Sequence, residues 1–164
     1  MKKIIFGLNV ILIIIDQLLK HLVTNNMSLY ESIDVIPNFL SITYVENDCG
    51  AFSIFSGNTW FFIIVSLFAL IFIIRTIIID NNMSRIDVLI YTLILSGLIG
   101  NLIDRIFYGK VIDYIDFKIF SYNAPIFNFA DICIVFGAFI LIYNLVLKDG
   151  NNESIYSGKW VKWY

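Results

Sequence analysis

Five short polar motifs interrupt a sequence that is otherwise rich in apolar residues. In chain order they are DQLLK at residues 16–20, VENDCGAF at 45–52, GNLIDR at 100–105, VIDYID at 111–116 and FNFAD at 127–131. The last two contain three aspartates, Asp113, Asp116 and Asp131, whose carboxyl groups could do chemistry as a pair. Two carboxyl groups that converge on one water molecule do not readily ionise together, so they divide the roles of base and acid. Such a pair can hydrolyse an amide with neither a metal nor a covalent intermediate.

The composition indicates an integral membrane protein. Of the 164 residues, 59% are hydrophobic, and the mean hydropathy is +0.84. Soluble domains usually contain about 45 to 50% apolar residues. The formal net charge of −2 provides no basic surface for a polyanion, so we expect no nucleic acid partner.

Four apolar runs, at residues 4–23, 60–79, 88–103 and 126–147, predict four transmembrane helices. Each run has about 16 to 22 residues, close to the roughly 20 that cross a hydrocarbon core. The first run could also be a signal peptide, since Lys2 and Lys3 precede it, but no small-residue cleavage site follows and the helical pattern continues. We therefore expect an all-α membrane protein with one four-helix transmembrane domain over residues 1–147 and a cytoplasmic tail over 148–164.

The basic residues predict the orientation of these helices. If the four helices alternate, seven basic residues fall on one side (Lys2, Lys3, Arg75, Arg85, Lys148, Lys159 and Lys162) and four on the other (Lys20, Arg105, Lys110 and Lys118). The positive-inside rule then places both termini in the cytoplasm. All five polar motifs lie toward the extracytoplasmic face in this topology. Charged groups are costly in hydrocarbon, so their gathering at one depth favours a shared site over five separate solvated ends.

The segment between the first two helices, residues 26–58, has the pattern of a small extracytoplasmic β-sheet. Its FLSITYV stretch mixes aromatic and β-branched residues and lies between Pro37-Asn38 and the turn-forming sequence NDCG. We expect this sheet to rest on the outer membrane surface, with one face toward lipid or an apolar ligand and the other toward water.

The ordered set DQLLK, VIPNFLSITYVEN, GNLIDR, VIDYID and FNFAD resembles the lipoprotein signal peptidases, also called signal peptidase II. The resemblance covers about residues 16–140. It implies a membrane aspartyl endopeptidase of the bacterial cell membrane, with Asp113 and Asp131 as the catalytic pair and no cofactor or metal. It also implies cleavage of prolipoproteins amino-terminal to a diacylglyceryl-modified cysteine, by an active site near the extracytoplasmic face. A lipidated substrate in the outer leaflet could enter such a site laterally, between helices.

The same resemblance implies roles for seven further residues. Five would bind substrate or orient the catalytic pair: Asn47, Asn101, Asp104, Arg105 and Asn128. Asp16 and Lys20 are spaced i, i+4, which predicts a local salt bridge, and the resemblance adds a structural role near the site. Simpler interpretations remain open: Asp113 as a solvated interfacial carboxylate, Asp131 as a charge at a helix N-terminus, and Asp104 and Arg105 as partners of other surface charges. Asp116 has no catalytic counterpart, and we expect it in a solvated loop.

The cysteines and the one histidine indicate no second chemistry. Cys49 and Cys133 form no CxxC pattern, so neither a zinc site nor a disulfide is predicted. No serine or cysteine motif lies near His21 that could form a nucleophilic unit with it. Cys49 occupies a position where the family usually has glycine, which places the turn beside Asn47 in doubt if that glycine adopts a positive φ.

Two other functions remain as alternatives. A non-catalytic paralogue would bind the lipidated protein without cleaving it. A small transporter or channel subunit would distribute polar residues through the depth of the membrane, whereas here they gather at one end and residues 60–79 are nearly free of them. We expect a monomer whose partners are the diacylglyceryl-modified prolipoprotein and membrane lipid.

Overall fold

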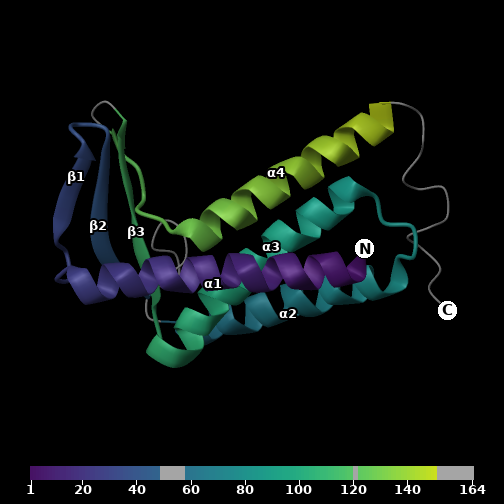
Figure 1. The fold of residues 1–164 in the computed structure, drawn as a ribbon, viewed down its shortest axis with the longest axis horizontal. Coiled ribbons are helices and arrows are strands. Elements are labelled where there is room, and N and C mark those ends of the chain that lie inside the picture. The colour runs from purple at the N-terminus through teal and green to yellow at the C-terminus, as the bar shows by residue number, and fades with distance from the viewer. Residues whose placement is uncertain (49–57, 120–121, 151–164) are drawn as a thin grey trace.

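The computed structural model describes residues 1–48, 58–119 and 122–150, and within them four helices are long and apolar enough to cross a membrane (Figure 1). They are α1 (Lys2–Asn26), α2 (Thr59–Ile79), α3 (Arg85–Tyr108) and α4 (Phe129–Gly150). Each contains most of one predicted apolar run, so the prediction of four transmembrane helices is confirmed. Cys49 and its turn, and the tail beyond residue 150, lie outside the described residues.

Helix α3 is longer than its apolar run because both of its ends are stabilised locally. Ser84 caps the first turn, and the Asp87 side chain accepts in return from the Ser84 backbone N–H, which forms a capping box. At the other end Gly109 adopts a left-handed conformation with φ of 73°, and its N–H donates to the Arg105 carbonyl. The chain then turns directly into a strand, which places the VIDYID motif beside the end of α3.

The strands form one antiparallel sheet in the order β1-β2-β3-β4. They are β1 (Ser32–Ile36), β2 (Leu40–Asn47), β3 (Val111–Ile119) and β4 (Tyr122–Asn123). Strand β2 contains most of the predicted FLSITYV strand, so a sheet between the first two helices is confirmed. However, β3 and β4 come from the segment between α3 and α4, which we did not predict as strands. The pairing of β2 with β3 joins the two halves of the extramembrane structure.

The sheet stands across one end of the helix bundle and has two different faces (Figure 1). Asp113 and Asp116 are an odd number of residues apart on β3, so their side chains project from opposite faces. On the face of Asp116, Thr43 Oγ1 donates to the Asp116 carboxylate at 2.9 Å. Our prediction of Asp116 in a solvated loop was therefore wrong, because β3 pairs with β2 through this position.

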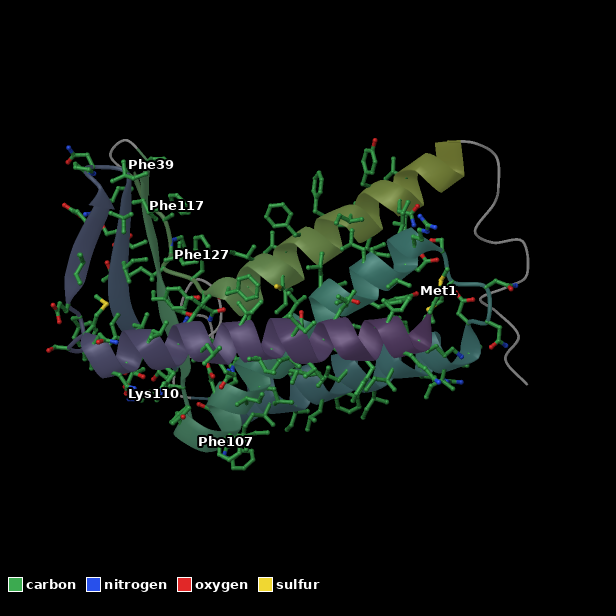
Figure 2. All side chains as sticks on the ribbon, viewed as in Figure 1. Met1, Phe39, Phe107, Lys110, Phe117 and Phe127 are labelled. Carbon is green, nitrogen blue, oxygen red and sulfur yellow. The ribbon has the colours of Figure 1, made fainter. Side chains whose placement is uncertain are left out.

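A row of aromatic residues lies along the sheet. Figure 2 shows Phe39, Phe117 and Phe127 in a row that leads toward the first turn of α4. The Phe39 and Phe117 rings are 5.3 Å apart and the Phe117 and Phe127 rings 5.9 Å apart. Phe127 also pairs with Ile115 of β3 through backbone hydrogen bonds. These contacts fix the segment immediately before α4 against β3.

Helix α3 is the centre of the bundle and contacts each of the other three helices. Its close approach to α4 depends on small residues. A Cβ atom on Gly137 of α4 would lie 2.6 Å from Ile94 Cγ1 of α3, which is closer than real side chains approach. Many apolar side chains on the outer surface of the helices are exposed, among them Phe6, Phe68 and Phe72, as expected where lipid chains replace water.

Candidate active site

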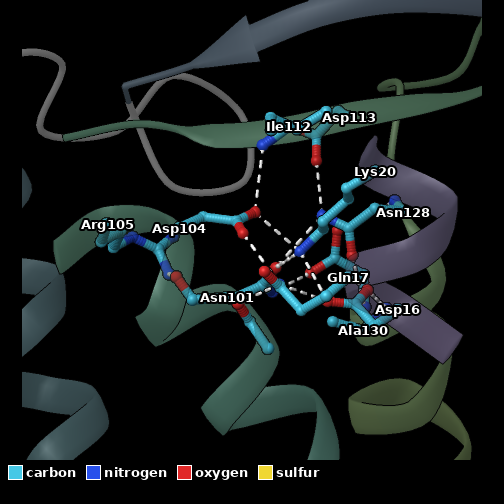
Figure 3. Close-up of polar contacts among 12 residues, drawn as sticks. Asp16, Gln17, Lys20, Asn101, Asp104, Arg105, Ile112, Asp113, Asn128 and Ala130 are labelled. Carbon is cyan, nitrogen blue, oxygen red and sulfur yellow. Dashed lines mark hydrogen bonds and ion pairs between the residues drawn. The ribbon is translucent and has the colours of Figure 1, made fainter. Parts of the chain in front are cut away.

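Two asparagines connect the two predicted catalytic carboxyl groups at the sheet end of the bundle (Figure 3). The Asn128 side-chain amide donates to Asp113 Oδ1 at 2.7 Å and to Asn101 Oδ1 at 3.1 Å. The Asn101 amide in turn donates to Asp131 Oδ1 at 2.7 Å. Residues from β3, α3 and the start of α4 thus form one chain of hydrogen bonds. The two aspartates belong to different secondary-structure elements, β3 and α4, and both lie at this site.

Asp131 occupies the third position of α4, where it exchanges hydrogen bonds with Asn128. The Asp131 N–H donates to Asn128 Oδ1 at 3.0 Å, and Asp131 Oδ2 accepts from the Asn128 backbone N–H at 3.3 Å. These reciprocal bonds form a capping box at the helix N-terminus, where a negative charge is favourable. The FNFAD motif therefore encodes both the start of α4 and the location of one carboxylate. The interpretation of Asp131 as a helix N-terminal charge is correct and compatible with a catalytic role.

Asp113 is almost completely buried, with an exposed fraction of 2%. Its second oxygen, Oδ2, accepts from the Asn47 side-chain amide at 2.8 Å. Burial is the main reason that the pKa of the Asp113 carboxyl is raised to about 7, and the charge of Asp131 adds to the rise. The hydrogen bonds from Asn47 and Asn128 act in the opposite direction. Asp113 is therefore not the solvated interfacial carboxylate of the simpler interpretation, and it can hold a proton near neutral pH.

A buried group of three charges lies beside these residues. Lys20 Nζ contacts Asp16 Oδ2 at 2.9 Å and Asp104 Oδ2 at 2.7 Å, and the three side chains are 0 to 2% exposed. The predicted salt bridge between Asp16 and Lys20 is present, but Asp104 from α3 completes it. We call Asp16, Lys20 and Asp104 the ion triad. Its Lys20 also donates to Asn101 Oδ1 at 3.2 Å, which connects the triad to the chain of hydrogen bonds between Asp113 and Asp131.

The side chains of the sequence neighbours Asp104 and Arg105 lie in different surroundings. Asp104 is completely buried, so its interpretation as part of a surface ion pair was wrong. Arg105 lies with its guanidinium carbon 5.2 Å from the centre of the Phe62 ring, and its Nη1 donates to the Asn101 carbonyl at 3.4 Å. Its guanidinium therefore lies at the contact between α2 and α3, one helical turn from Asn101.

Two residues at this site were not singled out from the sequence. Gln17 Nε2 donates to Asp16 Oδ2 at 3.1 Å and to Asp104 Oδ1 at 3.0 Å. Gly100 lies directly against Asp16, because a Cβ atom on it would be 2.5 Å from Asp16 Oδ2. Gln17 belongs to the DQLLK motif and Gly100 to the GNLIDR motif, so the motifs included both residues. Their function depends on the contact between α1 and α3, which no local pattern specifies.

A cavity of about 220 Å³ lies on the other side of β3 from Asp113. Its lining includes Lys20, Asp104 and Ile112 but neither Asp113 nor Asp131. Because neighbouring residues of a strand project from opposite faces, Ile112 faces this cavity while Asp113 faces Asn128. The cavity therefore reaches the ion triad from the side of β3 opposite to Asp113, and it is not a space between the carboxyl groups of Asp113 and Asp131.

The described residues contain no group of three histidine, cysteine or acidic side chains that could hold a metal ion. His21 is exposed, and its Nε2 lies 2.8 Å from the amide of Asn25. Cys133 is a buried free thiol in α4. The site described above contains two carboxyl groups held by amide donors.

Comparisons with known proteins show a family and solved structures to which this chain is similar over most of its length. The family model described as Signal peptidase (SPase) II matches residues 8–147. The lipoprotein signal peptidases of Staphylococcus aureus strains JH9 and Newman are each 36% identical over 156 residues, 93% of this chain and 95% of theirs. A bacterial membrane enzyme structure obtained by the in meso method at 2.3 Å resolution has a TM-score of 0.85 and 34% identity, over 92% of each chain. A second, at 1.9 Å, has a TM-score of 0.79 and 35% identity.

Proposed function

This chain belongs to the signal peptidase II family, and from that premise we propose that it is an aspartic endopeptidase with Asp113 and Asp131 as its catalytic pair. As a member of this family it is a multi-pass membrane peptidase that removes signal peptides from prolipoproteins. The observation that carries the aspartic assignment is the chain of hydrogen bonds from Asp113 through Asn128 and Asn101 to Asp131. That chain holds both carboxyl groups in one site, which supports the assignment.

The environments of the two carboxyl groups suggest different roles. Asp113 is buried in the sheet with a pKa raised to about 7, which suits the group that carries the proton at the start of the reaction. Asp131 accepts hydrogen bonds from the Asn101 amide and from the Asn128 backbone N–H, so both of its carboxyl oxygens face donors. We assign Asp131 as the base that takes a proton from water, and Asp113 as the acid that hydrogen-bonds the scissile carbonyl.

With these roles, the aspartate pair holds one proton both before and after the reaction. Water attacks the carbonyl carbon while Asp131 accepts one of its protons, and Asp113 donates a hydrogen bond to the oxygen that becomes negative. The C–N bond then breaks, and the departing amine takes one proton from the pair. The other product leaves as a carboxylic acid, so the pair again holds a single proton.

The substrate proposed from the family is a prolipoprotein with a diacylglyceryl-modified cysteine, cleaved amino-terminal to that cysteine. The site lies where the helices meet the sheet, so a lipid-modified chain could approach from the membrane while its peptide reaches the carboxyl groups. We propose that this end faces the extracytoplasmic side, that both termini are cytoplasmic, and that the enzyme acts as a monomer. Seven basic residues against four on the two sides support this orientation.

The remaining predicted site residues divide by their contacts. Asn47 and Asn128 donate to Asp113, and Asn101 donates to Asp131, so we assign all three to orienting the catalytic pair. Arg105 lies next to Asn101 and is the remaining candidate for a substrate contact, because a guanidinium can bind peptide carbonyls in two-pronged fashion.

The test is the processing of a lipidated prolipoprotein by the isosteric variants Asp113→Asn and Asp131→Asn. We expect both to lose cleavage while still inserting into the membrane, because an amide cannot supply the acid or base. The matched control is Asp116→Asn, on the same strand but the opposite face, which should cleave normally. Cleavage by either variant at the unmodified rate would refute the catalytic pair. Substrate binding without cleavage by the unmodified protein would instead identify a non-catalytic paralogue.

A further inference from the structure

Each proposed catalytic aspartate directly follows a residue whose backbone N–H is bound by a buried carboxylate. The N–H of Ala130, which precedes Asp131, donates to Asp16 Oδ1 at 3.0 Å. The N–H of Ile112, which precedes Asp113, donates to Asp104 Oδ2 at 3.3 Å. The start of α4 and the start of β3 are thus each attached to one member of the ion triad.

Lys20 joins the two carboxylates that make these attachments, so one ammonium group lies between them (Figure 3). Gln17 bridges the same two side chains, with bonds to Asp16 Oδ2 and to Asp104 Oδ1. The distance between the two carboxylates is therefore limited from two directions. It follows that the separation of Ala130 from Ile112 is limited too.

Every charged atom of the triad has a hydrogen-bond partner. All four carboxylate oxygens of Asp16 and Asp104 accept at least one bond. The three hydrogens of the Lys20 ammonium are matched by Asp16, Asp104 and Asn101. A buried charge without partners is strongly unfavourable, whereas a fully satisfied network is rigid. The triad can therefore hold the two backbone groups in one geometry.

We propose that Asp16 and Asp104 are positioning residues that set the spacing between Asp113 and Asp131, with Lys20 fixing the distance between them. This inference rests on the proposed function. The physical reason is that two carboxyl groups must share one water molecule, and a misplacement of about 1 Å can cost about a hundredfold in rate. No member of the triad needs to contact substrate in this role.

Gly100 makes the attachment to α4 sterically possible. A Cβ atom at this position would lie 2.5 Å from Asp16 Oδ2 and 3.3 Å from the Ala130 Cβ. An added methyl group would therefore push the Asp16 carboxylate away from the Ala130 N–H without changing any charge. Gly7 of α1 offers a matched comparison, since a Cβ atom there would meet nothing within 4 Å.

The experiment compares Gly100→Ala and Asp16→Asn with Gly7→Ala in purified enzyme, using a lipidated prolipoprotein peptide. We expect the first two to lower kcat by about ten- to hundredfold per folded molecule with KM nearly unchanged, because the substrate contacts remain while the reacting groups move. Gly7→Ala should match the unmodified enzyme in both constants. The folded fraction is measured by size-exclusion chromatography and thermal unfolding, so a loss of folded protein alone is separated from a loss of kcat.

The outcomes distinguish this inference from the proposed function. If Asp113→Asn and Asp131→Asn are inactive while folded Asp16→Asn keeps the unmodified kcat, the positioning role is wrong and the catalytic pair stands. If Asp113→Asn or Asp131→Asn is fully active, the proposed function fails first. Should Gly100→Ala not fold, the isosteric Asp16→Asn still decides, because it adds no atom to the contact between the helices.

Discussion

Replacing Asp113 with asparagine should remove a pH-dependent loss of stability of the folded protein. Asp113 is buried in β3 with a pKa raised from 3.8 to about 7, so folding favours its protonated form. The protein is then most stable with respect to this group below about pH 3.8, and it loses stability as the pH rises toward about 7. An asparagine does not ionise, so the variant lacks this dependence.

The expected magnitude follows from the two pKa values. Their separation of about 3 pH units corresponds to about 4 kcal/mol once the pH exceeds both values, at about 1.36 kcal/mol per unit. Roughly 3 kcal/mol of this accumulates between pH 5 and pH 8.5, because the unfolded group is already mostly ionised at pH 5. A change of that size corresponds to several degrees in melting temperature for a chain of this length.

The assay is thermal unfolding of the purified protein in detergent at pH 5 and pH 8.5. The unmodified protein should lose more melting temperature between the two conditions than Asp113→Asn does. Asn47 now meets an amide instead of a carboxylate oxygen, and this lowers the stability of the variant by an amount independent of pH. Asp116→Asn, on the opposite face of β3, should behave like the unmodified protein. Equal pH dependence in the unmodified protein and Asp113→Asn would refute Asp113 as a buried acid.

Two further substitutions probe the amide and guanidinium groups. Asn128→Ser keeps a side-chain oxygen that can cap α4 but removes the amide that donates to Asp113 and Asn101, so cleavage should fall by about tenfold or more while the melting temperature changes little; an equal loss of both would mean that capping is its main role. Arg105→Lys removes the planar group over Phe62, and we expect KM to rise about two- to fivefold, measured against Arg85→Lys at the other end of α3. An unchanged KM would exclude Arg105 from substrate binding.

Much of the membrane domain could be predicted from the sequence because the bilayer imposes simple rules. Helix length and apolar composition define the spans, and the depth of the polar motifs places them at one end. The β2 strand was also predictable, since Leu40 to Val45 has β-branched and aromatic residues between turn signals. The proposal of Asp113 and Asp131 as the catalytic pair came from the family resemblance, because periodicity alone does not select Asp113 over Asp116.

The pairing of β2 with β3 could not be predicted from local pattern. The segment VIDYIDFKI does not alternate strictly between apolar and polar residues, because Asp113 and Asp116 are three residues apart. These two aspartates therefore fall on opposite faces of the strand that the structure shows. A register shift between Ile42 and Val45 also sets which β2 residue lies opposite Asp113. This irregularity places Asn47 where it can donate to Asp113. Such a bulge depends on contacts between distant segments, so a single sequence does not specify it.

The i, i+4 spacing of Asp16 and Lys20 predicted a local ion pair, and that pair is present. The spacing could not indicate that Asp104 would join it from another helix, or that the three would be buried. Burial changes what the ion pair contributes to the stability of the protein. An exposed pair of this kind contributes little stability, whereas a buried one must have every partner in place. The role that we infer for the triad therefore depends on the packing of α1 against α3.

The two carboxyl groups differ because they belong to different kinds of secondary structure. Asp131 lies in the first turn of α4, where unpaired backbone N–H groups surround it with positive partial charge. Asp113 lies in strand β3, where the side-chain amides of Asn47 and Asn128 donate to its carboxyl oxygens. A proton shared by the pair is therefore better placed on Asp113. The fold thus gives the two proposed catalytic groups different surroundings, as the proposed roles of acid and base require.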